Sequence, residues 1–175
     1  YALAMTLISI PVSVIAGSVS SVYFRELASR SGDTASSLAL TRNTTVGLIS
    51  VATFPVILIG VSATHLFPII FGPQWSEAGR FAVALLPWAC MRLIGIPLSA
   101  ALAVTRKQLW QLLWQVALLI GFVAAYILGA WLGADAVTCT WIASIVSVPM
   151  YLILVPMVYS AIRGQETQEQ AEPSP

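Results

Sequence analysis

Charged side chains are scarce in this chain of 175 residues, where they make up 9% of the sequence, against roughly 25% in an ordinary soluble domain. Hydrophobic residues make up 58%, and this composition excludes a soluble globular protein. Eight Lys and Arg nearly balance seven Asp and Glu. The basic excess needed to bind nucleic-acid phosphates is therefore missing, and nucleic acid is not expected as a partner.

Residues with catalytic or metal-binding chemistry are also few, since the chain has one His and two Cys. Cys90 and Cys139 both fall inside apolar runs, where thiols usually pack as small hydrophobic groups, and their spacing resembles neither a metal site nor a redox pair. The chain also lacks a paired-carboxylate site, a nucleophile with a His partner and a glycine-rich phosphate loop. We therefore expect no enzyme, no catalytic residues, no metal and no cofactor.

Long apolar runs dominate the chain instead. A membrane-spanning helix takes about 20 predominantly apolar residues, so five of them fit within this length without a soluble domain. The predicted fold class is all-α, a polytopic membrane helix bundle over residues 1–162, with a polar tail over 163–175 that should be disordered. The transmembrane helices are expected at about residues 1–24, 45–67, 81–105, 109–132 and 136–162.

The connections between these runs carry their own signals. Residues 29–44 are rich in Ser, Thr, Asn and Gly, which predicts a short surface helix or loop. Residues 68–75 gather prolines, a glycine and aromatic residues, which predicts a turn at the membrane interface. Trp75, Trp110 and Trp131 fall near the ends of predicted spans and are expected to be interfacial anchors.

Basic residues fall mostly on one side of the predicted bundle. The opposite side holds only Arg80, whereas the links after the first, third and fifth spans hold Arg25, Arg30, Arg42, Arg106, Lys107 and Arg163. Because basic residues that flank spans are retained in the cytoplasm, the first span should run inward and the tail should be cytoplasmic. The chain opens at Tyr1 inside an apolar run without an initiator Met, so we expect a fragment of a longer membrane protein. An odd number of spans should precede it if the complete protein starts inside.

Small residues and prolines indicate how the helices pack. Close packing in lipid depends on small side chains, so two ridges with four-residue spacing are expected to meet protein: Ser9, Ser13, Gly17 and Ser21, and Gly121, Ala125, Gly129 and Gly133. This packing is either plainly structural or lets a helix slide during a transport cycle. Prolines inside the predicted spans favour bent helices, and they are Pro11, Pro55, Pro87, Pro97, Pro149 and Pro156.

Arg92 is the one charged residue within the predicted spans, and it lies about midway along 81–105. A charge at the bilayer centre is costly and normally faces a partner or a water-filled cavity. Its guanidinium can hold a phosphate or carboxylate with two hydrogen bonds, so Arg92 is the candidate substrate-binding residue. The structural alternative is a pair with an acidic residue or carbonyl on a missing span, or snorkelling. The five predicted spans contain no Asp or Glu, so any site for a coupling ion should lie elsewhere.

Three stretches carry a resemblance to a family of transporters. Residues 1–4 (Tyr-Ala-Leu-Ala) open an apolar span that closes with residues 22–27 (Val-Tyr-Phe-Arg-Glu-Leu). Residues 66–78 (Leu-Phe-Pro-Ile-Ile-Phe-Gly-Pro-Gln-Trp-Ser-Glu-Ala) then lead into a span that contains Pro97. In these features the chain resembles the bacterial polysaccharide and O-antigen flippases of the multidrug, oligosaccharidyl-lipid and polysaccharide transporter superfamily. One departure lies at residues 104–107 (Val-Thr-Arg-Lys), where relatives often have a Gly before the basic residue.

The resemblance implies that the chain is part of the C-terminal lobe of a twelve-helix transporter in the bacterial cytoplasmic (inner) membrane. Such proteins move an undecaprenyl-pyrophosphate-linked oligosaccharide to the periplasmic leaflet for lipopolysaccharide or exopolysaccharide biosynthesis. Their cavities are lined by basic residues, and Arg92 is the matching position here. The implied partners are this lipid-linked substrate, membrane lipids, the missing N-terminal lobe and the polysaccharide polymerase machinery.

Two other functions stay open. A cation-coupled multidrug exporter of the same superfamily should carry intramembrane acidic residues, and the predicted spans have none. A non-transporting membrane scaffold for glycan assembly would use the small-residue faces for binding and would tolerate the loss of Arg92.

Overall fold

The computed structural model describes the backbone of residues 1–30 and 32–171 and the side chains of 1–30 and 32–164. The described residues form α1 (Ala2–Ser29), α2 (Thr34–Phe71), α3 (Ser76–Val104), α4 (Gln108–Trp131) and α5 (Ala136–Ala171), with a 3-10 turn at Pro73–Trp75. All five α-helices are long and apolar enough to cross a membrane. The predicted all-helical fold is confirmed. The turn expected over residues 68–75 starts later than predicted, because α2 continues through Pro68 to Phe71 and ends at Gly72, whose φ of 99° suits a glycine.

α2 begins earlier than the apolar run that defines its span. It starts at Thr34 and takes in most of the polar link predicted over residues 29–44. The reason is local, because Asp33 caps the helix by accepting a hydrogen bond from the backbone N–H of Ser36 at 3.0 Å. Helix formation therefore starts at the cap rather than at the first long apolar run.

α5 also extends past its predicted span. Its backbone is helical to Ala171, beyond the expected boundary at Ile162. The side chains of 165–171 and the whole of 172–175 lie outside the described residues, so the disorder of the tail over 163–175 stays a prediction.

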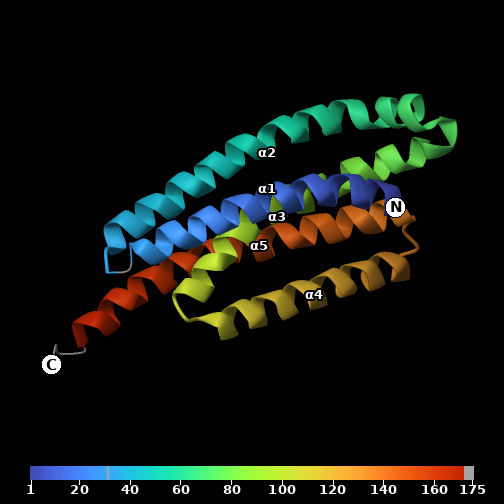
Figure 1. Cartoon of the computed structure of the whole chain (residues 1–175). Coiled ribbons are helices and arrows are strands. Elements are labelled where there is room, and N and C mark those ends of the chain that lie inside the picture. The colour runs from blue at the N-terminus through green and yellow to red at the C-terminus, as the bar shows by residue number, and fades with distance from the viewer. Residues whose placement is uncertain (31, 172–175) are drawn as a thin grey trace.

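α3 is the centre of the bundle. It packs against α1, α2 and α5, while successive helices run in opposite directions and α2 curves over the others (Figure 1). More than half of its most apolar stretch is buried, far more than in any other of these helices. Small side chains permit this close packing on several sides, and the buried ones include Ala78, Ala82, Ala84, Ala89 and Ala101.

A buried hydrogen bond joins α1 to α2 near one end of the bundle. The hydroxyl groups of Tyr23 and Thr41 lie 2.8 Å apart, and both side chains are almost fully buried. Thr41 also donates to the carbonyl of Ser37 in its own helix at 2.8 Å. The polar groups at this crossing are thus satisfied, as burial requires.

The two small-residue ridges have different environments. On α4, a Cβ added to Gly129 would lie 2.7 Å from Sγ of Cys139, and one added to Gly121 would lie 2.9 Å from Met150, so this ridge packs against α5 as predicted. On α1, Gly17 has no such neighbour within 4 Å. Within the described part of the chain, α1 instead buries a face that contains Ala4, Ile8, Ala16, Tyr23 and Leu27. The expected protein contact of the α1 ridge stays a prediction.

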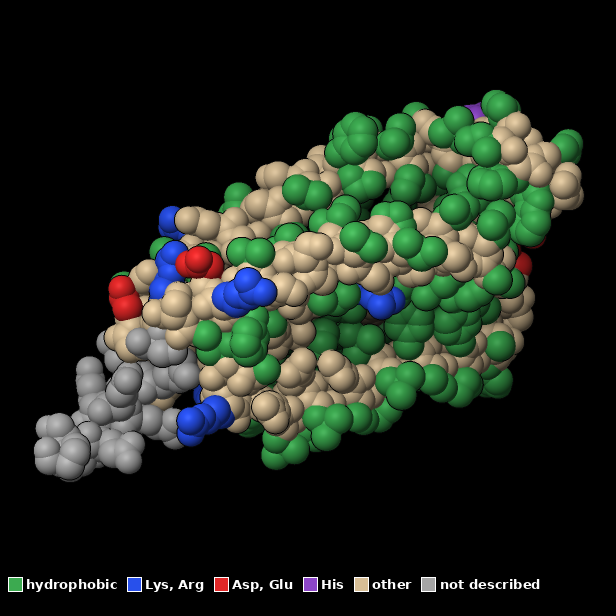
Figure 2. Space-filling model, in the orientation of Figure 1, with side chains coloured by type: hydrophobic (Ala, Val, Ile, Leu, Met, Phe, Trp, Pro, Cys, Tyr) green, Lys and Arg blue, Asp and Glu red, His purple; other side chains and the backbone are tan. Residues whose placement is uncertain are grey.

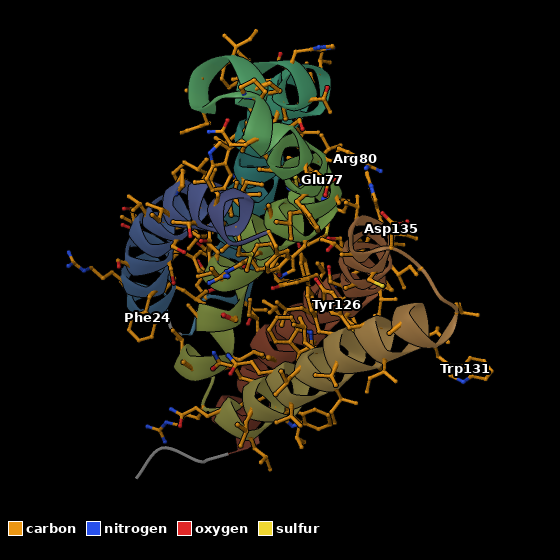
Figure 3. The ribbon with its side chains drawn as sticks, turned by 90° about the vertical axis from the view of Figure 1, so that its right-hand side faces the viewer. Phe24, Glu77, Arg80, Tyr126, Trp131 and Asp135 are labelled. Atoms are coloured by element: carbon orange, nitrogen blue, oxygen red, sulfur yellow. The ribbon has the colours of Figure 1, made fainter. Side chains whose placement is uncertain are left out.

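The topology separates the charges into two groups. The links after α1 and α3 lie at the same end as the end of α5, where blue side chains gather in Figure 2. Figure 3 looks onto the opposite end, where Glu77, Arg80 and Asp135 lie together and Trp131 points away from the bundle. The strongly basic end predicted from the sequence is therefore one physical end of the bundle.

Asp135 begins α5 at the less basic end. The Thr138 hydroxyl donates a hydrogen bond to Oδ1 of Asp135, and this bond, helped by nearby Arg80, holds the pKa of the Asp135 carboxyl below its ordinary value. The negative charge of this carboxylate, just before the first residue of α5, interacts favourably with the positive N-terminal end of the helix dipole.

Two helices end in the same turn but with different residues in it. After α3 the N–H of Lys107 bonds to the carbonyl of Leu102 at 2.8 Å, and after α4 the N–H of Ala134 bonds to the carbonyl of Gly129 at 3.0 Å. Such turns need a residue with positive φ. Gly133 fills that position after α4 with φ 69°, whereas Arg106 fills it after α3 with φ 56°. Arg106 therefore holds a left-handed backbone conformation that a glycine adopts without strain.

Replacing Arg106 with Gly should stabilise the protein. A residue with a Cβ is disfavoured at positive φ, so Arg106→Gly should raise the free energy of unfolding by about 0.5–1 kcal/mol. Thermal unfolding in detergent would measure it. Gly133→Ala is the converse control. An added Cβ at Gly133 meets no atom within 4 Å, but the positive φ of this residue strains any residue other than glycine. The temperature of unfolding of Gly133→Ala should therefore fall. A lower midpoint for Arg106→Gly would contradict the assigned turn.

Candidate functional site

Arg92 lies near the middle of α3 and is half-buried. Its guanidinium carbon is 5.0 Å from the centre of the Trp88 ring. The two residues are four apart, so they share one face of the helix. A cation over an indole face gains about 0.5–1 kcal/mol at exposed sites and more where water is excluded, so Trp88 holds the guanidinium without neutralising it.

The charge of Arg92 is not compensated within the described part of the chain. The ion pairs found there join Arg30 to Glu26 and Arg80 to Glu77, both near helix ends. Among the described side chains, none gives Arg92 a hydrogen bond or a salt bridge. The structural alternative, a pair with a group on a missing span or snorkelling, stays a prediction that these side chains do not test.

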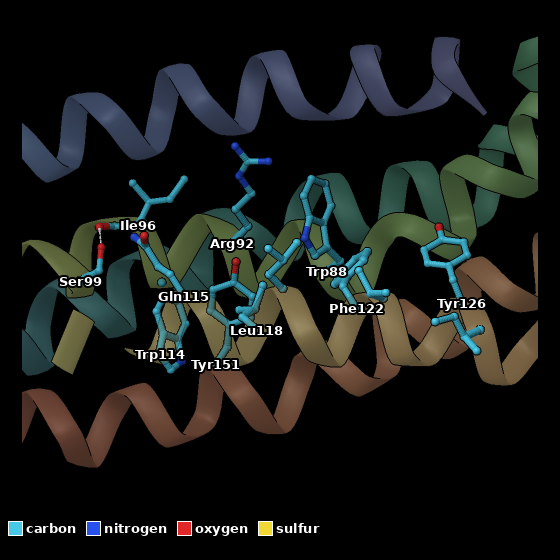
Figure 4. Close-up of a pocket in the computed structure, with 14 residues that line it drawn as sticks. Trp88, Arg92, Ile96, Ser99, Trp114, Gln115, Leu118, Phe122, Tyr126 and Tyr151 are labelled. Atoms are coloured by element: carbon cyan, nitrogen blue, oxygen red, sulfur yellow. Dashed lines mark hydrogen bonds between the residues drawn. The ribbon is translucent and has the colours of Figure 1, made fainter. Parts of the chain in front are cut away.

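Arg92 lies in the wall of a groove of about 620 Å³. The groove forms because α4 packs mainly against α5 and makes little contact with α3. Figure 4 shows Arg92 extending from α3 toward α1, with residues of α4 and Tyr151 of α5 below it. Its lining residues are mostly apolar and aromatic, and they include Trp88, Ile96, Trp114, Gln115, Leu118, Phe122, Tyr126 and Tyr151.

Gly95 allows Tyr151 to enter this groove. A Cβ at Gly95 would lie 2.4 Å from Cδ1 and Cε1 of the Tyr151 ring, so the ring needs the missing side chain. Trp114 packs edge-on against the Tyr151 ring, with 5.2 Å between the two ring centres. Its indole Nε1–H also donates a hydrogen bond to the backbone carbonyl of Met150 at 2.8 Å. In Figure 4 the Tyr151 hydroxyl points toward Arg92.

Aromatic side chains from α4 continue the groove. Phe122 lies 6.5 Å from Trp88 and 6.1 Å from Tyr126, measured between ring centres. Trp114, Leu118, Phe122 and Tyr126 recur every four residues and form one row along α4. The prediction from sequence contains Arg92 alone and misses these rings, although this four-residue spacing is a signal that could have found them.

The groove also contains polar groups without partners in the described part of the chain. The Tyr151 hydroxyl and the Gln115 amide make no hydrogen bond there, whereas the Ser99 hydroxyl donates to the carbonyl of Ile96 at 2.8 Å. One cation, two polar groups without described partners and several rings suit the recognition of an anionic ligand. No group of three His, Cys, Asp or Glu that could hold a metal occurs among the residues the structure describes.

Comparison with known proteins bears on one part of the chain. The curated proteins and the solved structures give no significant match. A family model described as polysaccharide biosynthesis protein matches residues 1–80, which comprise α1, α2 and the start of α3. Arg92 and the aromatic row of α4 lie beyond that stretch. Over residues 1–80, this chain of membrane-span-like helices is therefore similar to the polysaccharide biosynthesis proteins.

Proposed function

We propose that the chain is part of a transporter that flips an undecaprenyl-pyrophosphate-linked oligosaccharide across the bacterial cytoplasmic membrane. The observation that carries this proposal is Arg92, which has no ion pair with any side chain that the structure describes and lies in the wall of a groove near the middle of the central helix. The protein is not an enzyme in this proposal and needs no cofactor. The match of residues 1–80 to polysaccharide biosynthesis proteins supports the class of cargo.

The energetics favour a ligand-binding role for Arg92. Placing Arg at the centre of a membrane helix costs about 2.5–3.5 kcal/mol on insertion scales. The cation–π contact with Trp88 offsets only part of that cost. An anionic group on the cargo would offset the remaining cost. A drug exporter for cationic compounds needs a negative charge in its site, whereas Arg92 supplies a positive one.

The arrangement of charges supports an orientation. The end of the bundle that holds most Arg and Lys faces the cytoplasm in our proposal, together with the C-terminus. The other partners are membrane lipids, an N-terminal lobe of the same protein and the polysaccharide polymerase machinery. The groove beside Arg92 would face that lobe.

Flipping can be measured with the complete protein in lipid vesicles. The probe is an undecaprenyl-pyrophosphate-linked oligosaccharide placed in both leaflets, and a lectin added outside reports how much of it can reach the outer leaflet. Active protein should bring the inner pool to the lectin, whereas protein-free vesicles should expose only the outer pool. No exchange would refute the transport proposal and favour the scaffold, whereas export of a cationic dye instead would favour the drug exporter.

A further inference from the structure

We infer that Arg106, Lys107 and Arg163 form a binding site for the phosphate of an anionic phospholipid of the surrounding membrane. These three residues are called the basic corner below, and they belong to the turn between α3 and α4 and to the neighbouring part of α5. The site is separate from Arg92 and does not depend on the proposed transport, so a protein that flips no cargo would still bind this lipid.

The fold brings the three cations of the basic corner together from distant parts of the chain. A Cβ added to Gly164 would lie 3.2 Å from Nζ of Lys107, so the Lys107 ammonium group rests beside α5, next to the residue that follows Arg163. Arg106 precedes Lys107 in the turn, and both Arg106 and Arg163 are exposed. The turn after α3 and the last part of α5 lie at the same end of the bundle (Figure 1).

The basic corner has no counter-ion among the described side chains. The ion pairs found there join Arg30 to Glu26 and Arg80 to Glu77, so neither reaches the corner. Positive charges held close together repel one another, and this repulsion destabilises the folded state. A phosphate bound between them removes the repulsion and accepts charge-assisted hydrogen bonds from both guanidinium and ammonium groups.

The surface beside the basic corner matches the rest of a phospholipid. α4 begins directly after Lys107 and exposes the large apolar side chains of Leu109, Trp110 and Leu113. A smaller share of its most apolar stretch is buried than in any other of the five helices. Cations followed by an exposed apolar helix suit a headgroup with acyl chains, whereas a free phosphate would leave the apolar surface unused. Basic sites at the ends of membrane helices bind anionic headgroups in this way, and Trp is enriched at the same depth.

The position of the basic corner favours a phospholipid over the pyrophosphate of the cargo. None of the three cations lines the groove beside Arg92, and neither do Leu109 and Trp110. The corner lies at one end of the bundle, about 21 Å from Arg92 at 1.5 Å per residue. A cargo must leave this end to cross the membrane, whereas a phospholipid stays in one leaflet and can remain bound.

Native mass spectrometry of the complete protein in a neutral detergent tests the assignment. Protein purified without added lipid should retain an anionic phospholipid, which is identified by its mass after release. In titrations, phosphatidylglycerol should bind at least about tenfold more tightly than phosphatidylethanolamine, which has a phosphate but no net charge. Inorganic phosphate at the same concentration should not displace phosphatidylglycerol, because it lacks acyl chains.

Matched pairs of substitutions separate the basic corner from the general charge of this end. Each Lys or Arg near the surface contributes about fivefold in affinity for an anionic lipid. Lys107→Gln combined with Arg163→Gln should therefore weaken phosphatidylglycerol about 25-fold and leave phosphatidylethanolamine unchanged. Arg25→Gln combined with Arg42→Gln removes two exposed charges near the same end and should leave both affinities nearly unchanged.

Thermal unfolding in the same detergent shows that a weak-binding variant is still folded. Without lipid, the Lys107→Gln and Arg163→Gln double variant should unfold at the temperature of the unmodified protein or slightly above it, because two repelling charges are gone. Added phosphatidylglycerol should raise the unfolding temperature of the unmodified protein more than that of the variant.

Four results would overturn the inference. Equal affinity for phosphatidylglycerol and phosphatidylethanolamine would mean that the basic corner is already neutralised. An equal loss in the Arg25→Gln and Arg42→Gln pair would show a diffuse attraction to the whole end. Displacement by inorganic phosphate would indicate a site for free phosphate, and a retained isoprenoid pyrophosphate would assign the corner to the cargo.

Discussion

Export of the glycan should fall about ten- to a hundredfold when Arg92 is replaced by Ala in the complete protein, at unchanged abundance in the membrane. This range corresponds to the loss of a charged hydrogen bond, about 1.5–3 kcal/mol. Arg92→Lys keeps the charge but loses the planar fork, so it should retain part of the activity. The measurement is surface glycan in a strain that depends on the variant, with membrane abundance measured in parallel.

Arg25→Ala is the matched control for this result, because Arg25 is exposed near one end of α1 and its loss removes the same charge. It should leave export nearly unchanged. If Arg92 were instead paired with a carboxylate elsewhere in the complete protein, Arg92→Ala should lower abundance rather than activity, and neutralising that carboxylate as well should restore it. Normal export by Arg92→Ala at normal abundance would contradict the binding role and favour the scaffold.

The second large effect is expected at Gly79, where α3 meets α2. A Cβ at Gly79 would lie 2.6 Å from the carbonyl oxygen of Ala63 and 3.0 Å from Cα of Thr64. These are backbone atoms and cannot rotate away, so α2 must shift. Gly79→Ala should lower the free energy of unfolding by about 1–3 kcal/mol, and Gly79→Leu should prevent accumulation of folded protein. Thermal unfolding in detergent and abundance in the membrane measure the two effects.

Gly47→Ala is the control for Gly79→Ala. Gly47 also lies inside a helix, but it has no neighbouring atom within 4 Å of an added Cβ. Alanine favours a helix by up to about 1 kcal/mol over glycine, so Gly47→Ala should be neutral or slightly stabilising. Equal stability of Gly79→Ala and Gly47→Ala would show that α2 and α3 are farther apart than described.

The positions of the helices follow from the sequence because the bilayer restricts the choices. A backbone inside lipid must satisfy its own hydrogen bonds, so a long apolar run forms a helix whatever its neighbours are. Composition alone therefore predicts five helices and places Arg92 at the middle of the third. The predicted helix boundaries are wrong where something other than an apolar run decides the end of a helix. At Asp33, for example, a polar capping residue begins α2 before the apolar run starts.

The packing of the helices does not follow from the sequence in the same way. In a soluble helix, the apolar stripe marks the buried face, but a membrane helix is apolar toward lipid as well as toward protein. The ridges of α1 and α4 show the consequence, since small residues recur every four positions in both. Only the ridge of α4 packs tightly against a neighbour in the described part of the chain, at Gly121 and Gly129.

The sequence by itself determined the helical spans, the basic end of the bundle and the position of Arg92 near the middle of the third helix, because each depends on local composition and charge. Only the tertiary structure decided what surrounds Arg92. Tyr151 reaches the groove from another helix, and it can do so because Gly95 leaves room for its ring. The four-residue row of α4 lines the same groove as Arg92 because α4 packs on α5 and makes little contact with α3. Such contacts between distant segments depend on side-chain fit, which no local pattern in an evenly apolar helix records.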